Sequence, residues 1–400
     1  MLKLAIFVTE YPSPSHNFVD REVIELLNLY TDIYCYSLNR KAYAPSNNSR
    51  LSILQKDTFI IKENTFSSPI KYLYVLPKLI KNTSFFLKEF FFHAKKGRGF
   101  KFFLYLIGAC TLAYDLKKKR ITNIHVHFAN TALNIAIIAK KTLNLKVSIT
   151  VHGPVDFTQP DFSFLQHYLP SLDGIRFISK EGLLKTLDKL SNQKKFQVIP
   201  CGVNLEELSH HPSEPSNNKF VILSVMRLVE DKNPFMLLKV AEILRDKNIN
   251  FIWKVIGEGH LRSILEEEIK NRKLVSNIQL LGIHSNNVVR NEILNSNCCV
   301  LTSKDEGTPV FLMEAMALGR IVISTKVGNI HELIEDQSSG FLVHSNEAER
   351  MSDILIKISE DKKQNKLGLG TVKLMARKKI ETSHDCKSNT KKLHDWLNSI

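Results

Sequence analysis

The sequence lacks any closely spaced framework of cysteines. Its six cysteines are scattered over 400 residues, and no two of them form a C-x-x-C pair. Small disulfide-stabilised domains and structural zinc sites normally show such spacings, so neither is expected here. Scattered free cysteines are typical of a reducing compartment, which predicts a cytoplasmic location.

Long apolar stretches are also missing. No run reaches the ~18 apolar residues that a membrane span needs. The N-terminal stretch MLKLAIFVTEYPS has too short an apolar run, and too early a polar break, for a signal peptide. We therefore expect neither a leader nor a spanning helix, and we interpret this stretch as a first β-strand.

Metal-binding motifs are equally scarce, since no D-x-D triplet occurs anywhere. His125 and His127 stand two apart in the strand-like run IHVHF and should project to one face of a sheet. No third Cys, His or carboxylate stands near them in the sequence to complete a site. The prediction is that the protein holds no metal ion.

Positive charge, by contrast, is abundant. The chain has 55 Lys and Arg residues against 40 Asp and Glu residues, for a formal net charge of +15. Such an excess indicates an anionic partner, which could be nucleic acid, an acidic membrane face or a phosphorylated substrate. Charge alone does not choose among these three.

The length and the strand pattern predict two domains. Four hundred residues exceed what one hydrophobic core usually organises. Buried strand-like runs alternate with helical spacing in both halves, beginning at Leu4 to Thr9 and again at Phe220 to Val225. We predict an α/β protein of two Rossmann-like, doubly wound domains facing across a cleft, with ligands at the carboxyl ends of the strands.

The domain boundaries follow from the same pattern. Residues 1–205 are predicted to form an N-terminal Rossmann-like domain, and residues 206–375 a C-terminal one. A polar, proline-rich linker is expected at 210–218, where the sequence is HHPSEPSNN. Helical spacing in the tail predicts that residues 376–400 form a helix that packs back on the first domain.

Residues 70–120 form an unusual aromatic and basic stretch with FFLKEFFFHAKKGRGFKFFLYLIG at its centre, and residues 84–107 are its most aromatic part. Such a segment can lie in a membrane interface, with its rings inserted and its lysines near anionic headgroups. It can equally form a pair of core-facing helices joined at Lys95 to Gly99. Nucleic-acid stacking fits less well, because the aromatic residues follow helical spacing and not a sheet platform.

The stretch EGTPVFLMEAMALG, from Glu306 to Gly319, has the pattern of a helix start between two carboxylates. Thr308 suits the N-cap position and Pro309 the first helical position. The backbone N–H groups that follow, at Val310 and Phe311, would have no partner within the helix and could bind a phosphate.

A second carboxylate, Glu314, stands one turn further along this helix and should lean back toward its start, where Glu306 lies. Cations follow the first strand of the second half, since Arg227 and Lys232 stand in SVMRLVEDKNP. Such a pair could neutralise a diphosphate. Gly257, in IGEGH after the next strand, would allow close backbone approach.

These motifs resemble, in order and spacing, the donor domain of the retaining glycosyltransferase family 4, which has the GT-B fold. The resemblance covers about residues 221–344 and rests on VMRLVEDKNP, IGEGH, LLGI, EGTPVFLMEAMALG and VISTKVGNIHELIEDQSSGFLV. It implies transfer of a sugar from a nucleotide diphosphate sugar with retention at the anomeric carbon. It also implies that no metal cofactor is needed.

The resemblance implies a role for each matching residue. Arg227 and Lys232 would bind the donor diphosphate, together with the N–H groups of Val310 and Phe311. Glu314 would bind the ribose.

Further roles follow from the same resemblance. Glu306 would lie beside the donor sugar, Gly257 would line the donor site and Ile283 would line the nucleobase. His152, in VHGP after a strand of the first half, would face the donor sugar from the other domain.

Two N-terminal patterns narrow the subgroup. SHNFVDREVIELL and HVHFANTALNIA resemble the S-x-T-F-x-x-x-E and H-x-H-F-A patterns of members that build exopolysaccharide, colanic-acid or capsular glycans, although His16 and Asn17 replace the usual Glu and Thr. In that subgroup the acceptor is generally a lipid-linked saccharide. This favours contact of residues 84–107 with an anionic membrane, and a peripheral position on its cytoplasmic face.

The function predicted from these features is that of a glycosyltransferase in cell-surface polysaccharide synthesis. One alternative is a sugar-nucleotide epimerase or a phosphorylase of the same fold, because fold does not fix function. Another is a non-enzymatic basic protein that binds a membrane or nucleic acid, but this explains no part of EGTPVFLMEAMALG. No specific nucleic acid is expected as a partner.

Overall fold

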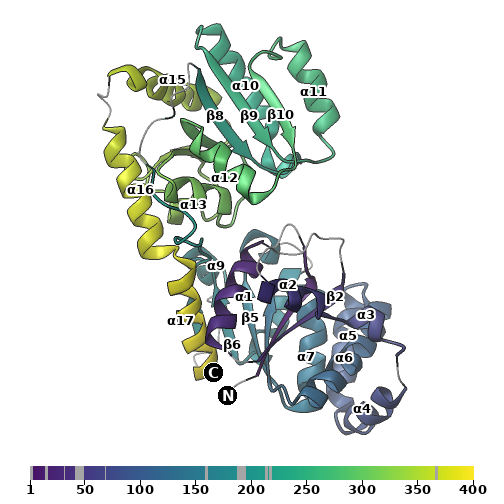
Figure 1. Cartoon of the computed structure of the whole chain (residues 1–400). Helices are drawn as coiled ribbons and strands as arrows, with labels where there is room; N and C mark the ends of the chain where they lie inside the picture. The colour runs from purple at the N-terminus through teal and green to yellow at the C-terminus, as the bar shows by residue number, and fades with distance from the viewer. Residues whose placement is uncertain are drawn as a thin grey trace. The chain divides into compact units, whose positions relative to one another are not determined.

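The computed structural model divides the chain into two compact units. It describes residues 3–13, 17–30, 32–40, 49–67, 69–157, 161–186, 195–211, 215, 219–364 and 368–400. Unit 1 comprises Met1–Pro200 and Cys386–Ile400, and unit 2 comprises Cys201–Asp385 (Figure 1). The chain thus passes between the units near residue 200 and again near residue 385.

Unit 1 is built on a seven-stranded parallel sheet in the order β3-β2-β1-β4-β5-β6-β7. Its strands are β1 Leu4–Glu10, β2 Ile33–Asn39, β3 Phe59–Ile60, β4 Asn123–His127, β5 Lys146–Val151, β6 Gly174–Phe177 and β7 Lys195–Val198. The strand order reverses between β1 and β4, as in doubly wound folds.

Both faces of this sheet are apolar because helices cover both. Along β1, Ala5 and Phe7 join the cluster formed with α6 and α7, while Leu4, Ile6 and Val8 join the cluster formed with α1 and α17. This alternation explains why β1 is a continuous apolar run in the sequence. The helices of unit 1 are α1 Asn17–Leu29, α2 Ser49–Lys56, α3 Ile61–Asn64, α4 Ile70–Lys81, α5 Thr83–Lys95, α6 Gly99–Lys119, α7 Thr131–Leu143, α8 Asp161–Tyr168, α9 Lys180–Leu184 and α17 Cys386–Ser399.

The aromatic stretch forms two helices, α5 and α6, joined at residues 96–98. Phe86, Phe102 and Tyr105 are buried in unit 1, which agrees with the core-facing interpretation. Phe91 and Phe100 are 60% and 78% exposed. The pair of helices therefore has a core face and, in addition, an apolar exposed face.

One helix differs from our expectation that no segment is long and apolar enough to span a membrane. Gly99–Lys119 is long and apolar enough to cross a membrane, judged by length and composition only. Half of its apolar window is buried inside unit 1, where the helix packs against α7. A core helix of a soluble protein has the same properties.

Unit 2 repeats the architecture with a six-stranded parallel sheet in the order β10-β9-β8-β11-β12-β13. Its strands are β8 Phe220–Val225, β9 Phe251–Ile256, β10 Ile278–Gly282, β11 Cys298–Leu301, β12 Ile321–Thr325 and β13 Phe341–Val343. Its helices are α10 Pro234–Asp246, α11 Arg262–Asn271, α12 Asn286–Leu294, α13 Val310–Ala317, α14 Ile330–Leu333, α15 Ala348–Gln364 and α16 Leu369–Ser383. The predicted α/β class with two doubly wound domains is confirmed.

The predicted linker and the start of the predicted C-terminal helix do not coincide with the points at which the chain passes between the units. Residues 212–214 and 216–218 of the predicted linker lie outside the described residues, and the N–H of His211 donates to Leu318 O within unit 2 at 3.3 Å. In the tail, α16 belongs to unit 2, and α17 alone packs on α1 in unit 1 (Figure 1).

Candidate active site

The sheet order of unit 2 fixes where its loops gather. From β8 the chain builds outward to β9 and β10 and then returns to place β11 on the other side of β8. β8 and β11 are neighbours, and the loops that follow them lead away in opposite directions. Open α/β sheets bind ligands between two such loops, at the carboxyl ends of the strands. Arg227 and Lys232 follow β8, and the stretch from Glu306 to α13 follows β11.

Lys232 and Glu306 meet at this point. Lys232 Nζ donates to Glu306 Oε1 at 2.5 Å, and Ser303 Oγ donates to the same carboxylate oxygen at 2.7 Å. Their side chains are 18% and 11% exposed, so the pair is largely withdrawn from water. The structure thus brings together a cation and an acid that lie 74 residues apart in the sequence, and each neutralises the other.

Helix α13 begins one residue later than predicted. Pro309 is the N-cap, with φ −71° and an extended ψ of 115°, and no side chain caps the helix. The prediction that Thr308 caps the helix and that Pro309 opens it is wrong, because Pro309 itself makes the turn into the helix. The first intrahelical donor is Met313 N, which bonds to Pro309 O at 3.2 Å. Val310 and Phe311 remain in the first turn, whose N–H groups have no intrahelical acceptor.

Glu314 stands in the second turn of α13 and is 6% exposed. A carboxylate at this depth depends on protein or ligand donors, because water reaches it poorly. Helical side chains lean toward the N-terminus, so Glu314 lies on the turn that precedes it. This position agrees with a carboxylate that serves the same site as the start of α13.

Arg227 occupies the exposed position of a short extended segment after β8. Met226 N donates to Ile256 O, and Leu228 N donates to Glu258 O, both at 2.9 Å. Met226 and Leu228 are buried, whereas Arg227 is exposed, as alternation along an extended chain requires. The guanidinium is therefore directed away from the core.

Gly257 allows the close backbone approach that its sequence context predicts, and the approaching segment is the loop after β8. Its φ is +137°, and a Cβ at this position would lie 1.8 Å from Met226 O. Glycine at 257 lets the loop after β9 lie directly against the loop that carries Arg227. Ile283 follows β10, which is separated from β11 by β9 and β8, and is 77% exposed.

His152 follows β5 in unit 1 and is 8% exposed. Its backbone N–H donates to Asp156 Oδ2 at 2.5 Å, while the other oxygen of Asp156 accepts from Ala129 N at 2.6 Å. Asp156 thus connects the loop after β4 with the loop after β5. Phe18 and Phe128 pack against the His152 ring, with centroids 4.8 and 4.5 Å away. The ring is held on several sides.

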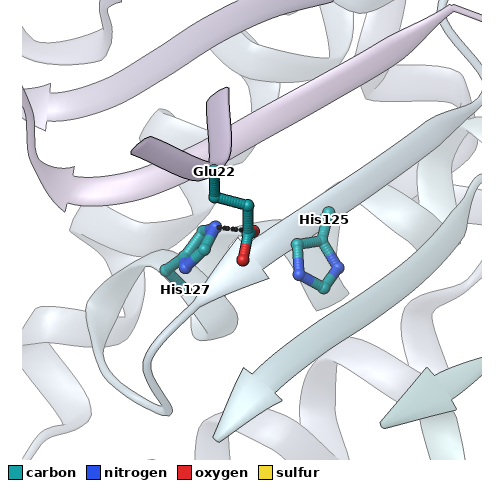
Figure 2. A group of neighbouring side chains, drawn as sticks. All are labelled: Glu22, His125 and His127. Atoms are coloured by element: carbon teal, nitrogen blue, oxygen red, sulfur yellow. Dashed lines mark ion pairs between the residues drawn. The ribbon is translucent and has the colours of Figure 1, made fainter. Parts of the chain in front are cut away.

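His152 also contacts a second histidine. His127 Nδ1 lies 3.0 Å from His152 Nε2, and the two rings stack with centroids 5.2 Å apart. Glu22, which comes from α1, lies beside His127 and His125 (Figure 2). Our expectation that no third ligand-type residue accompanies the two histidines holds only along the sequence, because the fold brings Glu22 to them.

The ligand atoms of Glu22, His125 and His127 lie close enough together to hold a metal ion, but their existing partners do not suit one. Their ligand atoms lie within 4.8 Å of one another. However, His125 already uses both ring nitrogens, with Ser148 Oγ at 2.8 Å and Thr150 Oγ1 at 2.7 Å. The Arg176 guanidinium contacts Glu22 and would repel a cation. The cluster is organised as an ion pair with hydrogen bonds.

His125 is uncharged in this cluster. Burial, followed by the neighbouring His127 and Arg176, holds the pKa of His125 well below its ordinary value of 6.5. A neutral imidazole has one donor and one acceptor nitrogen, which suits two hydroxyl partners. His125 therefore serves as a fixed spacer between β4 and β5.

The structure brings two of the predicted site residues of unit 2 into direct contact, while unit 1 contains one predicted site residue, His152. In unit 2, Lys232 and Glu306 are in contact, and Arg227, Gly257 and the start of α13 come from the adjoining loops. In unit 1, His152 is joined to His127 and Glu22, which sequence reasoning did not assign to a site. The sequence could have pointed to Glu22 as a site residue, since Glu22 is the last residue of the N-terminal pattern SHNFVDRE.

Comparison with known proteins adds sequence relatives. Residues 206–369 match the family model described as Glycosyl transferases group 1. The chain is 26% identical to the amylovoran biosynthesis glycosyltransferase AmsK of Erwinia amylovora, over 95% of each chain. It is 24% identical to the UDP-Gal:alpha-D-GlcNAc-diphosphoundecaprenol alpha-1,3-galactosyltransferase of Escherichia coli, over 62% of this chain and 69% of that one.

Solved structures resemble the whole chain. The Anabaena protein HepE in complex with UDP and glucose matches with a TM-score of 0.75 at 14% identity, over 100% of both chains. The sucrose-phosphate synthase of Thermosynechococcus elongatus matches with a TM-score of 0.70 at 16% identity, over 100% of this chain and 99% of that one. At these identities the likeness concerns the fold.

Proposed function

We propose that the chain is a glycosyltransferase that transfers a hexose from a UDP- or GDP-sugar, with retention. The match of residues 206–369 to the Glycosyl transferases group 1 family model and the similarity to AmsK support this proposal. The acceptor is a hydroxyl of a lipid-linked saccharide in cell-surface polysaccharide synthesis. The observation that carries this proposal is the Lys232–Glu306 pair beside the start of α13, at the switch point of the unit 2 sheet.

The chemistry requires a site that tolerates growing charge of both signs. When the sugar leaves the nucleotide, negative charge develops on the diphosphate and positive character on the anomeric carbon. Arg227, Lys232 and the N–H groups at the start of α13 would stabilise the diphosphate. Glu306 would then release Lys232 to the phosphate and face the sugar with its carboxylate.

The same arrangement makes a resident metal unnecessary. A guanidinium, an ammonium and a helix N-terminus supply the charge that a divalent cation provides in other nucleotide-sugar sites. Turnover is therefore expected to persist within about twofold in excess EDTA. A loss of activity that Mg²⁺ or Mn²⁺ restores would contradict metal independence without contradicting sugar transfer.

The acceptor part of the proposal draws on the relatives and on the surface of unit 1. The E. coli relative is named for a diphosphoundecaprenol acceptor. On α5 and α6, large apolar side chains are exposed among lysines: Leu87, Phe91, Phe100, Phe103 and Leu104. Near the end of α4, a cavity of about 820 Å³ is lined by Lys78, Lys81, Lys117, Arg120 and Lys141. These features suit a peripheral protein on an anionic, cytoplasmic membrane face.

The test is transfer of labelled sugar. The full chain is incubated with radiolabelled UDP- and GDP-sugars and a membrane extract, and label is expected in the lipid fraction. The anomeric configuration of the product, read by NMR, should match that of the donor. Lys232→Met should abolish the signal, whereas Lys304→Met, an exposed lysine in the same region, should retain it. Label found only as an epimerised nucleotide sugar would refute the transferase.

A further inference from the structure

The two N-terminal sequence patterns meet in the fold. Glu22 closes the pattern SHNFVDRE on α1, and His127 belongs to the pattern HVHFA on β4. The switch in strand order between β1 and β4 places the helix after β1 beside the carboxyl end of β4. Residues 105 positions apart thereby become neighbours, with His127 Nε2 3.5 Å from Glu22 Oε1 (Figure 2).

Four side chains form a continuous line from β6 to the loop after β5. Arg176 Nη1 contacts Glu22 Oε2, and Glu22 Oε1 faces His127 Nε2. His127 Nδ1 then contacts His152 Nε2 at 3.0 Å. Glu22, His127 and Arg176 are 7%, 0% and 2% exposed, so water does not screen the charges along this line.

We propose that Glu22 is a positioning residue that acts on His152 through His127. The inference rests on the proposed role of His152 beside the donor sugar. Glu22 fixes which ring nitrogens carry protons, and it supplies a buried negative charge on the far side of the histidine pair.

The assignment of protons follows from what each group can do. An ionised carboxylate only accepts hydrogen bonds, so Glu22 favours a proton on His127 Nε2. In neutral His127 the other nitrogen, Nδ1, is then an acceptor. The 3.0 Å contact with His152 therefore needs a proton on His152 Nε2, which leaves Nδ1 of His152 as the acceptor nitrogen.

Arg176 holds Glu22 in place through a buried ion pair. Besides contacting Glu22, it donates from Nε to Ile199 O at 2.9 Å and from Nη2 to Pro200 O at 3.3 Å. A guanidinium bound by several acceptors is rigid and always charged. This contact also disfavours the alternative occupant of the cluster, a metal ion shared by Glu22 and the two histidines.

The effect on the reaction is electrostatic. Positive character that develops on the sugar raises the energy of a site unless negative charge or an acceptor lies nearby. With its Nδ1 fixed as an acceptor, His152 presents a lone pair, and the Glu22 charge behind it favours that state. Other groups that face the line are His125 from β4, Asp156 from the loop after β5 and Cys386 from α17.

The direct test is the protonation pattern of the histidines in the full-length wild-type protein. Long-range ¹H–¹⁵N NMR on ¹⁵N-histidine-labelled protein distinguishes the two tautomers, and His152→Gln and His127→Gln spectra assign the two rings. We expect His127 and His152 both to carry the proton on Nε2. Protonation of His152 on Nδ1 would overturn the proposal whether or not the protein transfers sugar.

Variants give a second, kinetic readout. Glu22→Gln should lower kcat by roughly 10- to 100-fold, as loss of an orienting partner does elsewhere, with the donor KM within about twofold. It should also mix the tautomers of His152 in the NMR spectrum. Glu22→Asp keeps the charge and should recover most of kcat. Glu25→Gln, the same change one helical turn along α1, is the matched control and should behave as wild type.

Three outcomes would contradict the inference. An unchanged His152 spectrum in Glu22→Gln would show that Glu22 does not set the tautomer of His152. A loss of kcat in Glu25→Gln as large as that in Glu22→Gln would show that the effect is not specific to Glu22. Stoichiometric Zn²⁺ in the wild type, measured by mass spectrometry and lost in Glu22→Gln, would show a metal site instead. If Glu22→Gln does not fold, Glu22→Asp and the wild-type spectrum still decide.

Discussion

At the scale of single residues, the two carboxylates around α13 should have separable roles. Glu314 is buried in the helix, and Glu306 is paired with Lys232. Glu314→Gln removes an acceptor for a ligand hydroxyl, so the Kd for UDP or GDP should rise by about 10- to 100-fold, measured by calorimetry. Turnover at saturating donor should fall much less.

Glu306→Gln should have the opposite profile. Without the carboxylate, the Lys232 ammonium has no counter-charge and remains available for the diphosphate, so nucleotide should bind at least as tightly as in wild type. kcat should fall by at least tenfold, because the acid beside the sugar is lost. Glu267→Gln, an exposed carboxylate on α11, is the control. Equal effects of the Glu306 and Glu314 variants on Kd and kcat would refute the division.

Gly257 should tolerate no side chain. A Cβ there would lie 1.8 Å from Met226 O, and φ of +137° is unfavourable for any other residue. Gly257→Ala should destabilise the protein by at least about 1–3 kcal/mol, measured by urea unfolding. Gly370→Ala, in the open space around α16, should be neutral or stabilising by about 0.5–1 kcal/mol. A neutral Gly257→Ala would mean that the loops after β8 and β9 do not lie in contact.

At the scale of helices, α5 is anchored by a titratable network. His93 Nε2 contacts Tyr168 Oη at 3.0 Å, and Tyr168 donates to Glu89, which also contacts His167. Burial lowers the pKa of His93 from 6.5 to about 4, although Glu89 opposes this and His167 and Arg98 add to it. The unfolded chain thus binds more protons between these pH values than the folded chain.

Stability should therefore decrease as the pH falls from about 6.5 to 4. The slope from His93 is at most about 1.4 kcal/mol per pH unit, since a single proton is involved. Urea unfolding at several pH values measures it, and His93→Gln should flatten the curve in this window. His394→Gln, on α17, is the control. A curve with the same slope in His93→Gln would assign the pH dependence to other groups.

The exposed face of α5 and α6 gives a second prediction at this scale. If it inserts into a membrane, the double substitution Phe91→Ser and Phe100→Ser should lower binding to anionic vesicles by at least about tenfold, because two large apolar side chains leave the interface. Flotation with vesicles of phosphatidylglycerol measures this. Leu374→Ser, 59% exposed on unit 2, is the matched control. Unchanged flotation would reject this face as the membrane contact.

The sequence predicted elements well where their residues carry a strong period. The strand Phe220–Val225 was predicted to the residue, since five of its six residues are apolar. The segment from residue 40 to residue 62 allowed no assignment, because α2 is mostly polar and β3 is only two residues long. A two-residue strand carries no period. Its place at the sheet edge depends on β2.

The candidate site shows the same limit. Lys232, Glu306 and Glu314 could be predicted as site residues because each stands in a motif with a known spacing. The Lys232–Glu306 contact and the line from Glu22 to His152 were not found, because each joins loops that only the strand order makes adjacent. Sequence spacing describes one element at a time.

At the scale of the whole molecule, the two units follow the same plan. Each parallel sheet reverses its strand order once, between β1 and β4 in unit 1 and between β8 and β11 in unit 2. In each unit a polar contact joins segments that follow the two strands at this reversal. Glu22 follows β1 and lies next to His127, at the end of β4, and Lys232 follows β8 and contacts Glu306, after β11. The division of labour between donor binding and catalysis can therefore be tested by asking which unit responds to which ligand.

Nucleotide should stabilise unit 2 selectively. All residues proposed to hold the diphosphate and ribose belong to unit 2, and a ligand that binds the folded state stabilises it by about 2.7 kcal/mol at 100 times its Kd. Hydrogen exchange on the full chain with UDP or GDP should show protection in residues 226–233 and 302–314, with little change in α4 to α6. Uridine and guanosine, which lack the diphosphate, should leave residues 226–233 unprotected, as should UDP added to Arg227→Gln. Protection confined to unit 1 would place the donor in the wrong unit and refute the assignment of Arg227, Lys232 and α13.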